Sequence, residues 1–266
     1  MPREIKPGSR ISKLPKFLIF PALFIRDTVL KNFVKKLPYT PNRYYYHHDG
    51  VATFNSSAFM RSDRFKIAYS ALVSAYKWDP DLPWRVHQII WSVDQVLNLD
   101  GVFVECGVGR GGLMASLTSS ISDWNLRNEK MFLFDTFESN TIYSKSGQKI
   151  STKQPNKYYA ESLEETRANF TQYDNITFVP GSVLETVSPG LCGEIKFLSI
   201  DLNNSEAEEY VFRTFYPDVV PGGIIILDDY YAAGRDRQRL LMDKMAIELN
   251  FNILATPSGQ GIVVKR

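Results

Sequence analysis

The sequence predicts an α/β protein built on a doubly wound, mostly parallel sheet of seven strands. Seven short apolar runs, rich in β-branched and aromatic residues, recur along the chain. Helical or polar stretches separate the first six runs, and this alternation is typical of a parallel sheet covered on both faces. The runs are residues 102–106, 131–134, 176–179, 195–200, 224–227, 251–254 and 262–264.

The connections between the runs refine this prediction. The last two runs are joined by Thr-Pro-Ser-Gly at 256–259, a short turn that permits a C-terminal antiparallel hairpin. Residues 85–97 carry apolar side chains at helical spacing, and Asn-Leu-Asp-Gly at 98–101 follows as a stop signal. Doubly wound sheets bind ligands beyond the carboxyl ends of their strands. The residues that follow each run are therefore the candidates for function.

Composition and charge indicate a globular protein with two differently charged parts. Of 266 residues, 44% are apolar and 23% charged, which excludes a disordered, collagen-like or polytopic membrane protein. Residues 1–43 carry ten basic and two acidic side chains, a balance of +8, whereas the remainder carries −6. We expect a basic N-terminal extension or lid over residues 1–60 and the main domain over residues 61–266. The two cysteines give no disulfide framework, which favours a reducing, cytoplasmic location.

The basic extension contains a predicted amphipathic helix over residues 22–37. Such a helix suits peripheral contact with an anionic membrane or a lid over a negatively charged substrate; alternatively, it packs on its own domain or on a second subunit of a homo-oligomer. The apolar run 17–25 is too short to span a bilayer, and no cleavage site follows it, so secretion is disfavoured. We interpret residues 37–50 as an irregular connector, in which His47 and His48 lack the nearby partners of a metal site.

A glycine-rich loop follows the first predicted strand. Gly107, Gly109 and Gly112 match G-x-G-x-x-G, in which missing Cβ atoms let a ligand lie against the backbone at a helix N-terminus. The alternative is a tight strand-to-helix turn without a ligand. Glu105 separates two cofactor classes, because a carboxylate there repels the pyrophosphate of NAD and suits the amino group and sulfonium of S-adenosylmethionine.

Two further strand ends carry candidate cofactor residues. Asp135 stands at the tip of the second strand, where a carboxylate usually accepts hydrogen bonds from ribose hydroxyls; the alternative is that it caps the next helix. After the third strand, Pro-Gly-Ser at 180–182 forms a turn where adenine could be contacted.

Three carboxylates end the fourth and fifth strands. Asp201 follows one strand, and Asp228 and Asp229 follow the next, so all three should converge at one edge of the sheet. Clustered carboxylates repel one another unless protons or a cation neutralise them, and Mg²⁺ prefers oxygen ligands. We therefore predict a divalent metal site here. Alternatively, Asp229 caps the following helix and Asp201 pairs with an arginine of the segment 235–239.

With these residues in place, the sequence resembles the class I S-adenosylmethionine-dependent methyltransferases, and specifically the macrocin O-methyltransferase-like group of sugar and antibiotic methyltransferases. The resemblance covers residues 84–266, and its later motifs are more specific than the glycine loop. It rests on Val-Glu-Cys-Gly-Val at 104–108 with Arg-Gly-Gly at 110–112, Phe-Asp-Thr-Phe-Glu at 134–138, Ser-Ile-Asp at 199–201, Pro-Gly-Gly at 221–223, Leu-Asp-Asp-Tyr at 227–230 and Gly-Gln-Gly at 259–261.

The resemblance implies roles for particular residues. The three aspartates would bind the divalent cation, and Asp201 would take the proton of the acceptor hydroxyl before in-line attack on the sulfonium methyl. This chain departs from the family pattern at Asn203 and Ser205, in the region of acceptor recognition, and at Ser182, where many class I enzymes have an Asp. The expected cofactor contacts are Glu105, Gly107, Val108, Gly109, Arg110, Asp135, Thr136 and Ser182.

The sequence thus predicts a cation-dependent O-methyltransferase that uses S-adenosylmethionine and Mg²⁺, or another divalent ion, and acts on a hydroxyl of a sugar, glycoside or related small molecule. We expect a small-molecule or glycan acceptor and no nucleic-acid partner. The inserted segment 139–159, with four lysines and several tyrosines, suggests a flap over an anionic acceptor, or a solvated loop. The alternatives are an NAD-dependent oxidoreductase on the same glycines and a membrane-recruited nucleotide-binding scaffold without catalysis.

Overall fold

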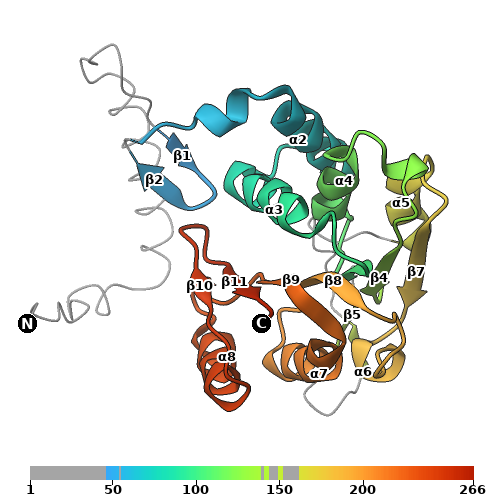
Figure 1. The fold of residues 1–266 in the computed structure, drawn as a ribbon, viewed down its shortest axis with the longest axis vertical. Helices are drawn as coiled ribbons and strands as arrows, with labels where there is room; N and C mark the ends of the chain where they lie inside the picture. Colours follow the sequence, from blue (N-terminus) through green and yellow to red (C-terminus); the bar gives the residue numbers. More distant parts are fainter. Residues whose placement is uncertain (1–45, 54, 139–140, 144–148, 152–161) are drawn as a thin grey trace, which may run out of the picture. The chain divides into compact units, whose positions relative to one another are not determined.

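A seven-stranded sheet forms the centre of the computed structural model, which describes residues 46–266 except 54, 139–140, 144–148 and 152–161 (Figure 1). The strand order is β10-β11-β9-β8-β3-β4-β7. The five strands from β9 to β7 run parallel, whereas β11 pairs antiparallel with both β9 and β10. The predicted fold class and the C-terminal hairpin are confirmed. The strands are β3 (Val102–Cys106), β4 (Met131–Asp135), β7 (Ile176–Pro180), β8 (Ile195–Ile200), β9 (Val219–Leu227), β10 (Leu254–Ala255) and β11 (Gly261–Val264).

Two strands differ from their predicted limits. β9 begins at Val219 rather than at residue 224, because a register irregularity opposite Ile195 lets the strand continue through its Pro-Gly-Gly segment. β10 contains only Leu254 and Ala255, although the predicted run began at Phe251. Phe251 is buried in the core before the strand begins, so its apolar character reflects packing and not strand pairing.

Three helices cover one face of the sheet: α2 (Asp63–Tyr76), α3 (Pro83–Val96) and α4 (Gly112–Ser119). Their buried side chains form one core cluster with alternate strand residues such as Phe103 and Phe197. α3 matches the predicted helix and begins with a proline, whose fixed φ suits the first helical turn.

The opposite face is covered by α6 (Val183–Thr186), α7 (Ser205–Phe215) and α8 (Asp236–Glu248). These helices pack in a second core cluster with the strand residues of the other parity, including Val104 and Leu198. Both faces of the sheet are therefore buried, which explains why its strands are continuous apolar runs. Short helices complete this part of the chain: α5 (Leu163–Arg167) and the 3₁₀ turns Ala58–Arg61, Trp124–Leu126, Ala168–Phe170 and Tyr216–Asp218.

A small antiparallel hairpin, β1 (Tyr46–His48) with β2 (Val51–Thr53), begins within the predicted connector 37–50, so the prediction of irregular structure is wrong for residues 46–50. Asp49 and Gly50 both have positive φ, 54° and 71°, as a two-residue type I′ turn requires. The Asp-Gly pair is thus the local signal for this hairpin. The described elements belong to one compact unit, Tyr45–Arg266, and the domain boundary at residue 60 stays a prediction.

Two other predictions lie wholly or partly outside the described residues. The amphipathic helix over 22–37 lies outside them. The flap segment, residues 139–159, contains a second hairpin, β5 (Thr141–Tyr143) with β6 (Lys149–Ser151), and its remaining residues are not described. Across the ranges that the structure does describe, none of the helices has the length and apolar character needed to cross a bilayer.

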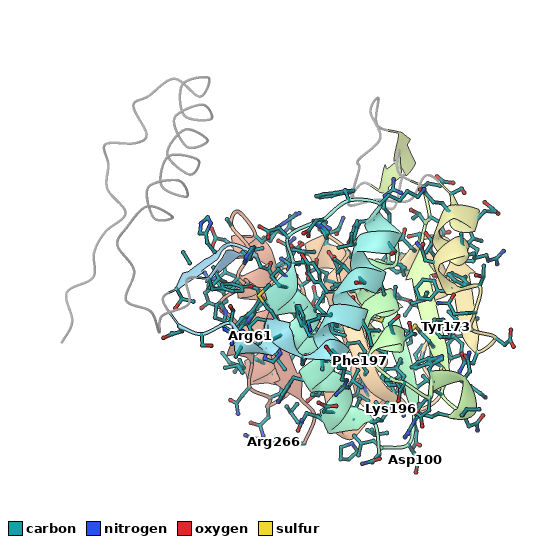
Figure 2. All side chains as sticks on the ribbon, turned by 90° about the horizontal axis from the view of Figure 1, so that it is seen from above. Arg61, Asp100, Tyr173, Lys196, Phe197 and Arg266 are labelled. Carbon is teal, nitrogen blue, oxygen red and sulfur yellow. The ribbon has the colours of Figure 1, made fainter. Side chains whose placement is uncertain are left out.

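A buried ion pair fastens the amino end of the sheet. Lys196 on β8, labelled in Figure 2, donates from Nζ to Glu129 Oε2 at 2.6 Å and to the carbonyl of Leu99 at 3.2 Å. The Nζ atom also lies 4.9 Å from the centre of the Phe103 ring. The Lys196 side chain is 3% exposed and that of Glu129 is 8% exposed. This contact lies at the end of the sheet away from the predicted site.

Candidate functional site

The loops after β3, β8 and β9 are held together by backbone hydrogen bonds that extend the sheet ladder. Gly107 N donates to Phe134 O at 2.8 Å, Asp201 N to Cys106 O at 2.9 Å, and Asp228 N to Ile200 O at 3.0 Å. These bonds place the first residue of each loop directly beside the end of the neighbouring strand. The glycine loop and the carboxylates of the predicted site therefore share one edge of the sheet.

Asp135 organises the glycine loop. Its Oδ2 accepts from the backbone N of Val108 at 2.7 Å and of Gly109 at 2.8 Å, and its Oδ1 accepts from Phe137 N at 2.9 Å. Thr136 Oγ1 adds a longer contact of 3.3 Å to Oδ1. The described residues 136–138 that follow Asp135 are not helical, so this carboxylate does not cap a helix there. Its hydrogen bonds fix the backbone of the glycine loop beside the end of β4.

The glycines of the loop are also required by packing. Gly107 has φ +90°, and a Cβ there would overlap the carbonyl oxygen of Asp201, so the loop lies directly against the end of β8. A Cβ at Gly112 would overlap the ring of Tyr76, which α2 places over the start of α4. Two of the fingerprint glycines thus have a structural reason that is independent of any ligand.

Glu105 is a buried carboxyl group beneath this loop. It is 2% exposed, lies opposite Ser199 on β8, and its Oε2 has no hydrogen-bond partner among the described residues. Burial raises the pKa of Glu105 well above its usual value, and the neighbouring Asp201 and Asp135 raise it further. A buried carboxyl with a free oxygen requires a proton or a cationic partner.

The remaining predicted cofactor residues divide into two groups. Val108 and Ser182 are buried near Asp135, and the turn before Ser182 is joined to it because Gly181 N donates to Asp135 O at 2.9 Å. Arg110 instead forms an ion pair with Glu165 on α5. The structure therefore brings the loop, Asp135 and the turn of Ser182 together, and joins the side chain of Arg110 to α5.

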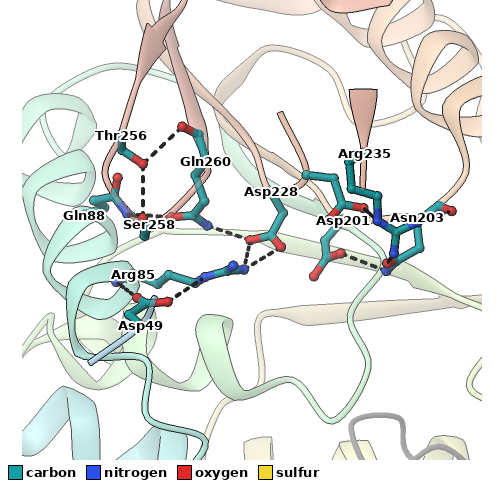
Figure 3. A network of polar contacts seen from close by, with 11 residues as sticks. Asp49, Arg85, Gln88, Asp201, Asn203, Asp228, Arg235, Thr256, Ser258 and Gln260 are labelled. Carbon is teal, nitrogen blue, oxygen red and sulfur yellow. Dashed lines mark hydrogen bonds and ion pairs between the residues drawn. The ribbon is translucent and has the colours of Figure 1, made fainter. Parts of the chain in front are cut away.

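Asp228 is held by an arginine and a glutamine (Figure 3). Arg85 Nη1 lies 2.5 Å from both carboxylate oxygens of Asp228, and Gln260 Nε2 donates to Oδ1 at 2.6 Å. Asp49 anchors the other side of Arg85, accepting from its backbone N at 3.0 Å and from its Nε at 3.3 Å. The hairpin β1–β2, α3, β9 and the C-terminal hairpin thus meet at one ion-paired network.

The amide of Gln260 is oriented by the neighbouring side chains. Gln88 Nε2 on α3 donates to Gln260 Oε1 at 2.5 Å and to Ser258 Oγ at 2.9 Å. Thr256 contacts Ser258 Oγ at 3.1 Å and donates to the carbonyl of Gln260 at 3.0 Å. Because Gln260 Oε1 accepts from Gln88, its Nε2 is directed to Asp228. The network fixes that carboxylate from the side of the C-terminal hairpin as well as from α3.

Asp201 and Asp229 lie on the other side of Asp228. Asp201 Oδ1 accepts from Asn203 Nδ2 at 3.1 Å, and Asn203 in turn accepts from Arg235. Arg235 forms an ion pair with Asp229, with 3.4 Å between Nε and Oδ2. Burial raises the pKa of Asp201 well above its usual value, and Asp228 and Asp229 raise it further. The arginine expected for Asp201 in the alternative reading therefore binds Asp229 and Asn203.

The predicted metal site does not fit the described residues as they stand. Within these residues, no group of three or more His, Cys, Asp or Glu side chains is arranged to hold a metal ion. Two of the three aspartates already have other partners: the oxygens of Asp228 accept from the guanidinium of Arg85 and the amide of Gln260, and Asp229 pairs with Arg235. Asp229 does not cap α8 either, since that helix begins only at Asp236.

Glu208 is a buried acid of this site that the sequence reasoning missed. It is 4% exposed, and burial, with a further contribution from Asp229, raises its pKa to about 8, whereas Arg235 lowers it. The signal was present in the helix pattern: Glu208 precedes Val211 and Phe212 by three and four residues, on the buried face of α7. An acidic residue at an apolar position of an amphipathic helix marks a buried carboxyl.

We expect Glu208→Gln to flatten the dependence of stability on pH. A carboxyl with a raised pKa holds its proton more tightly in the folded state, so the stability it allows is present at low pH and is lost as pH rises from its ordinary range through about 8. As pH rises from about 5 to about 9, the range in which this carboxyl loses its proton, the melting temperature should fall less in the variant than in the wild type. Glu206→Gln on the same helix is the control; equal slopes in all three proteins would contradict the assignment.

With this geometry established, the comparisons identify the family. A model of the macrocin-O-methyltransferase (TylF) family matches residues 84–251, more than half of the chain. The chain belongs to the macrocin-O-methyltransferase family. The match runs from α3 to the end of α8 and includes the glycine loop, Asp135 and the three aspartates, so the resemblance proposed from these motifs is confirmed.

The chain is also similar to two proteins that are named as O-methyltransferases. Demethyldecarbamoylnovobiocin O-methyltransferase of Streptomyces niveus is 28% identical over 156 residues, 55% of this chain and 60% of the relative. Mycinamicin III 3''-O-methyltransferase of Micromonospora griseorubida is 25% identical over 159 residues, 55% of this chain and 62% of the relative. The chain thus spans less than two thirds of the length of these relatives.

The fold is shared with solved methyltransferases. The O-methyltransferase NovP superposes with a TM-score of 0.60 at 22% identity, over 76% of this chain and 96% of that chain. The calicheamicin methyltransferase CalS11 gives 0.54 at 17% identity, over 76% and 93%.

Proposed function

We propose that this protein is an S-adenosylmethionine-dependent O-methyltransferase that acts on a hydroxyl of a sugar, glycoside or related small molecule. The observation that carries the proposal is Glu105, a buried carboxyl with a free oxygen beneath a glycine loop that Asp135 holds in place. A carboxylate there suits a ligand with an amino group and a sulfonium, and opposes the pyrophosphate of NAD. Family membership supports the same activity.

The sugar acceptor rests on the relatives. One of them is named as a methyltransferase of a rhamnosyl-tetracenomycin, from Streptomyces olivaceus, and is 26% identical over 156 residues. CalS11 is also described as a TDP-rhamnose 3'-O-methyltransferase. We propose for this chain the same class of acceptor, a sugar hydroxyl, and no particular sugar.

The residues of the loop would bind and orient the cofactor. The amides of Val108 and Gly109, fixed by Asp135, and the neighbouring turn of Ser182 would line its nucleoside, and Glu105 would face its charged end. S-adenosylmethionine supplies an already activated methyl group, so alignment of donor and acceptor accounts for most of the catalysis required of the protein.

Asp201 is the proposed general base. Its carboxylate lies at the end of β8, against the glycine loop, and receives a hydrogen bond from Asn203 at 3.1 Å. The raised pKa of Asp201 makes its ionised form a stronger base for the acceptor hydroxyl than an ordinary carboxylate. The proton would pass to an Asp201 oxygen as the hydroxyl oxygen bonds to the methyl carbon, and the sulfur–methyl bond would break to leave S-adenosylhomocysteine.

A divalent cation is kept out of this proposed reaction, because the contacts of Asp228 leave the expected ligand set incomplete. Cation dependence was expected from the resemblance, and the assay below measures it directly. Peripheral membrane contact, homo-oligomerisation and a cytoplasmic location likewise stay predictions from the sequence.

The test is transfer of a labelled methyl group from S-adenosylmethionine to a panel of deoxysugar glycosides and nucleotide-linked sugars, with and without chelator. We expect Asp201→Asn to lower kcat by about 10²- to 10⁴-fold, the usual contribution of general base catalysis. Binding of S-adenosylhomocysteine should change little, which separates the role of the base from that of a cofactor ligand. A variant that retains full kcat would remove Asp201 from the mechanism.

A further inference from the structure

We propose that Arg85 is a built-in cation for Asp228, and that a divalent ion can bind the three aspartates only by displacing this guanidinium. The inference goes beyond the proposed function and starts from a disagreement: the residues expected to hold a metal are present, but two of them already have positive partners, Asp228 in Arg85 and Asp229 in the more distant Arg235.

The contact geometry makes Arg85 and a metal ion competitors. Nη1 of Arg85 lies 2.5 Å from both oxygens of Asp228, and Gln260 Nε2 lies 2.6 Å from one of them. A hard divalent ion requires the same oxygen lone pairs. Arginine keeps its charge at all ordinary pH values, so the guanidinium cannot leave by losing a proton. It has to be moved.

Arg85 has a second carboxylate partner, Asp49, which it would keep after displacement from Asp228. Asp49, in the turn of the β1–β2 hairpin, accepts from the backbone N of Arg85 at 3.0 Å and from its Nε at 3.3 Å. The side chains of Asp49 and Arg85 are 3% and 18% exposed. When a cation takes Asp228, Arg85 therefore keeps a buried carboxylate as partner, and its charge is not stranded. Asp49 is both the anchor of the arginine and its remaining partner after displacement.

The other aspartates explain why a metal would enter once Arg85 is gone. Asp229 is buried, and its Oδ2 has no hydrogen-bond partner among the described residues, although Arg235 lies 3.4 Å away. Within the described ranges, Asp201 receives a single hydrogen bond from a side chain, that of Asn203. Removal of Arg85 would leave three carboxylates at one edge of the sheet with Arg235 as their near cation. Excess negative charge of this kind favours binding of a divalent ion.

The experiment is titration with Mn²⁺ alone, followed by the electron paramagnetic resonance signal of the free ion. We expect Arg85→Ala to bind Mn²⁺ at least about tenfold more tightly than the wild type, an energy typical of one charged contact. Arg85→Lys keeps the charge and should remain close to the wild type. Asp228→Asn added to Arg85→Ala should remove the gain. Arg213→Ala, which breaks an exposed ion pair with Glu248, is the control and should leave Mn²⁺ affinity unchanged.

Two results would overturn the proposal: a wild type that binds Mn²⁺ as tightly as Arg85→Ala, or a folded Arg85→Ala that shows no gain. If Arg85→Ala does not fold, Arg85→Gln, which retains a donor to Asp228 without the charge, serves the same comparison. None of these readouts uses methyl transfer. Loss of the proposed activity assignment would leave the Mn²⁺ result standing, and failure of the competition would leave methyl transfer unaffected.

Discussion

Gly107→Ala is expected to abolish binding of S-adenosylhomocysteine and to destabilise the domain. The added Cβ would overlap the backbone oxygen of Asp201, and alanine would have to adopt φ +90°. Relief requires the loop to move away from β8, which separates the amides of Val108 and Gly109 from Asp135. Overpacking and the left-handed conformation together cost on the order of 3 kcal/mol of unfolding free energy. Urea denaturation and calorimetric titration with S-adenosylhomocysteine measure the two effects.

Gly190→Ala is the matched control for the backbone conformation. Gly190 has φ +72°, but a Cβ there would meet no atom within 4 Å. This variant should lose only about 1–2 kcal/mol, the cost of a left-handed residue, and should bind S-adenosylhomocysteine like the wild type. Equal losses in the two variants would show that the contact of Gly107 with Asp201 has no energetic weight.

Lys196→Met is expected to produce a large loss of stability without a direct effect on the site. The substitution removes the Nζ atom 2.6 Å from the buried carboxylate of Glu129, which then keeps the more exposed Arg127, 3.2 Å away, as its ion-pair partner. Breaking a buried ion pair from one side typically costs about 3–5 kcal/mol. Urea unfolding of the free protein should show this loss as a lower midpoint, with a smaller change in the slope.

A double variant distinguishes the cost of an unpaired charge from the cost of altered packing. Lys196→Met combined with Glu129→Leu removes both charges, so it should recover much of the lost stability. Arg213→Ala, which breaks an exposed pair, should cost no more than about 1 kcal/mol. If Lys196→Met lost no more unfolding free energy than Arg213→Ala, the importance assigned to the buried pair would be contradicted.

The fold could be predicted from the sequence because its strands are buried on both faces. β8 matches the predicted run at both ends, since every residue from Ile195 to Ile200 is buried, Lys196 through its ion pair. The predicted ends of β10 and β9 were wrong because burial and strand pairing do not coincide there. Phe251 is buried in the core but is not part of a strand, and β9 continues through Pro221 because the irregular register tolerates it. An apolar sequence pattern indicates which residues are buried, and it indicates strand hydrogen bonding only indirectly.

The candidate site was predictable in position and less so in its contacts. Strand ends located Asp135 and Asp228 because parallel strands end at one edge of the sheet. The partners of Asp228 were not predictable, since Arg85 lies 143 residues away in the sequence and on a helix that looks ordinary. No local pattern shows that a helix-surface arginine will face a strand-end aspartate. The Asp49-Gly50 pair was a turn signal that could have located the second anchor of Arg85.

Calorimetric titration of the full chain with S-adenosylhomocysteine and, separately, with NAD⁺, each with and without Mg²⁺, tests most directly whether the loop above Glu105 is a methyl-donor site. We expect saturable binding of S-adenosylhomocysteine and no binding of NAD⁺, whether or not Mg²⁺ is present. Binding of NAD⁺ without S-adenosylhomocysteine would contradict it.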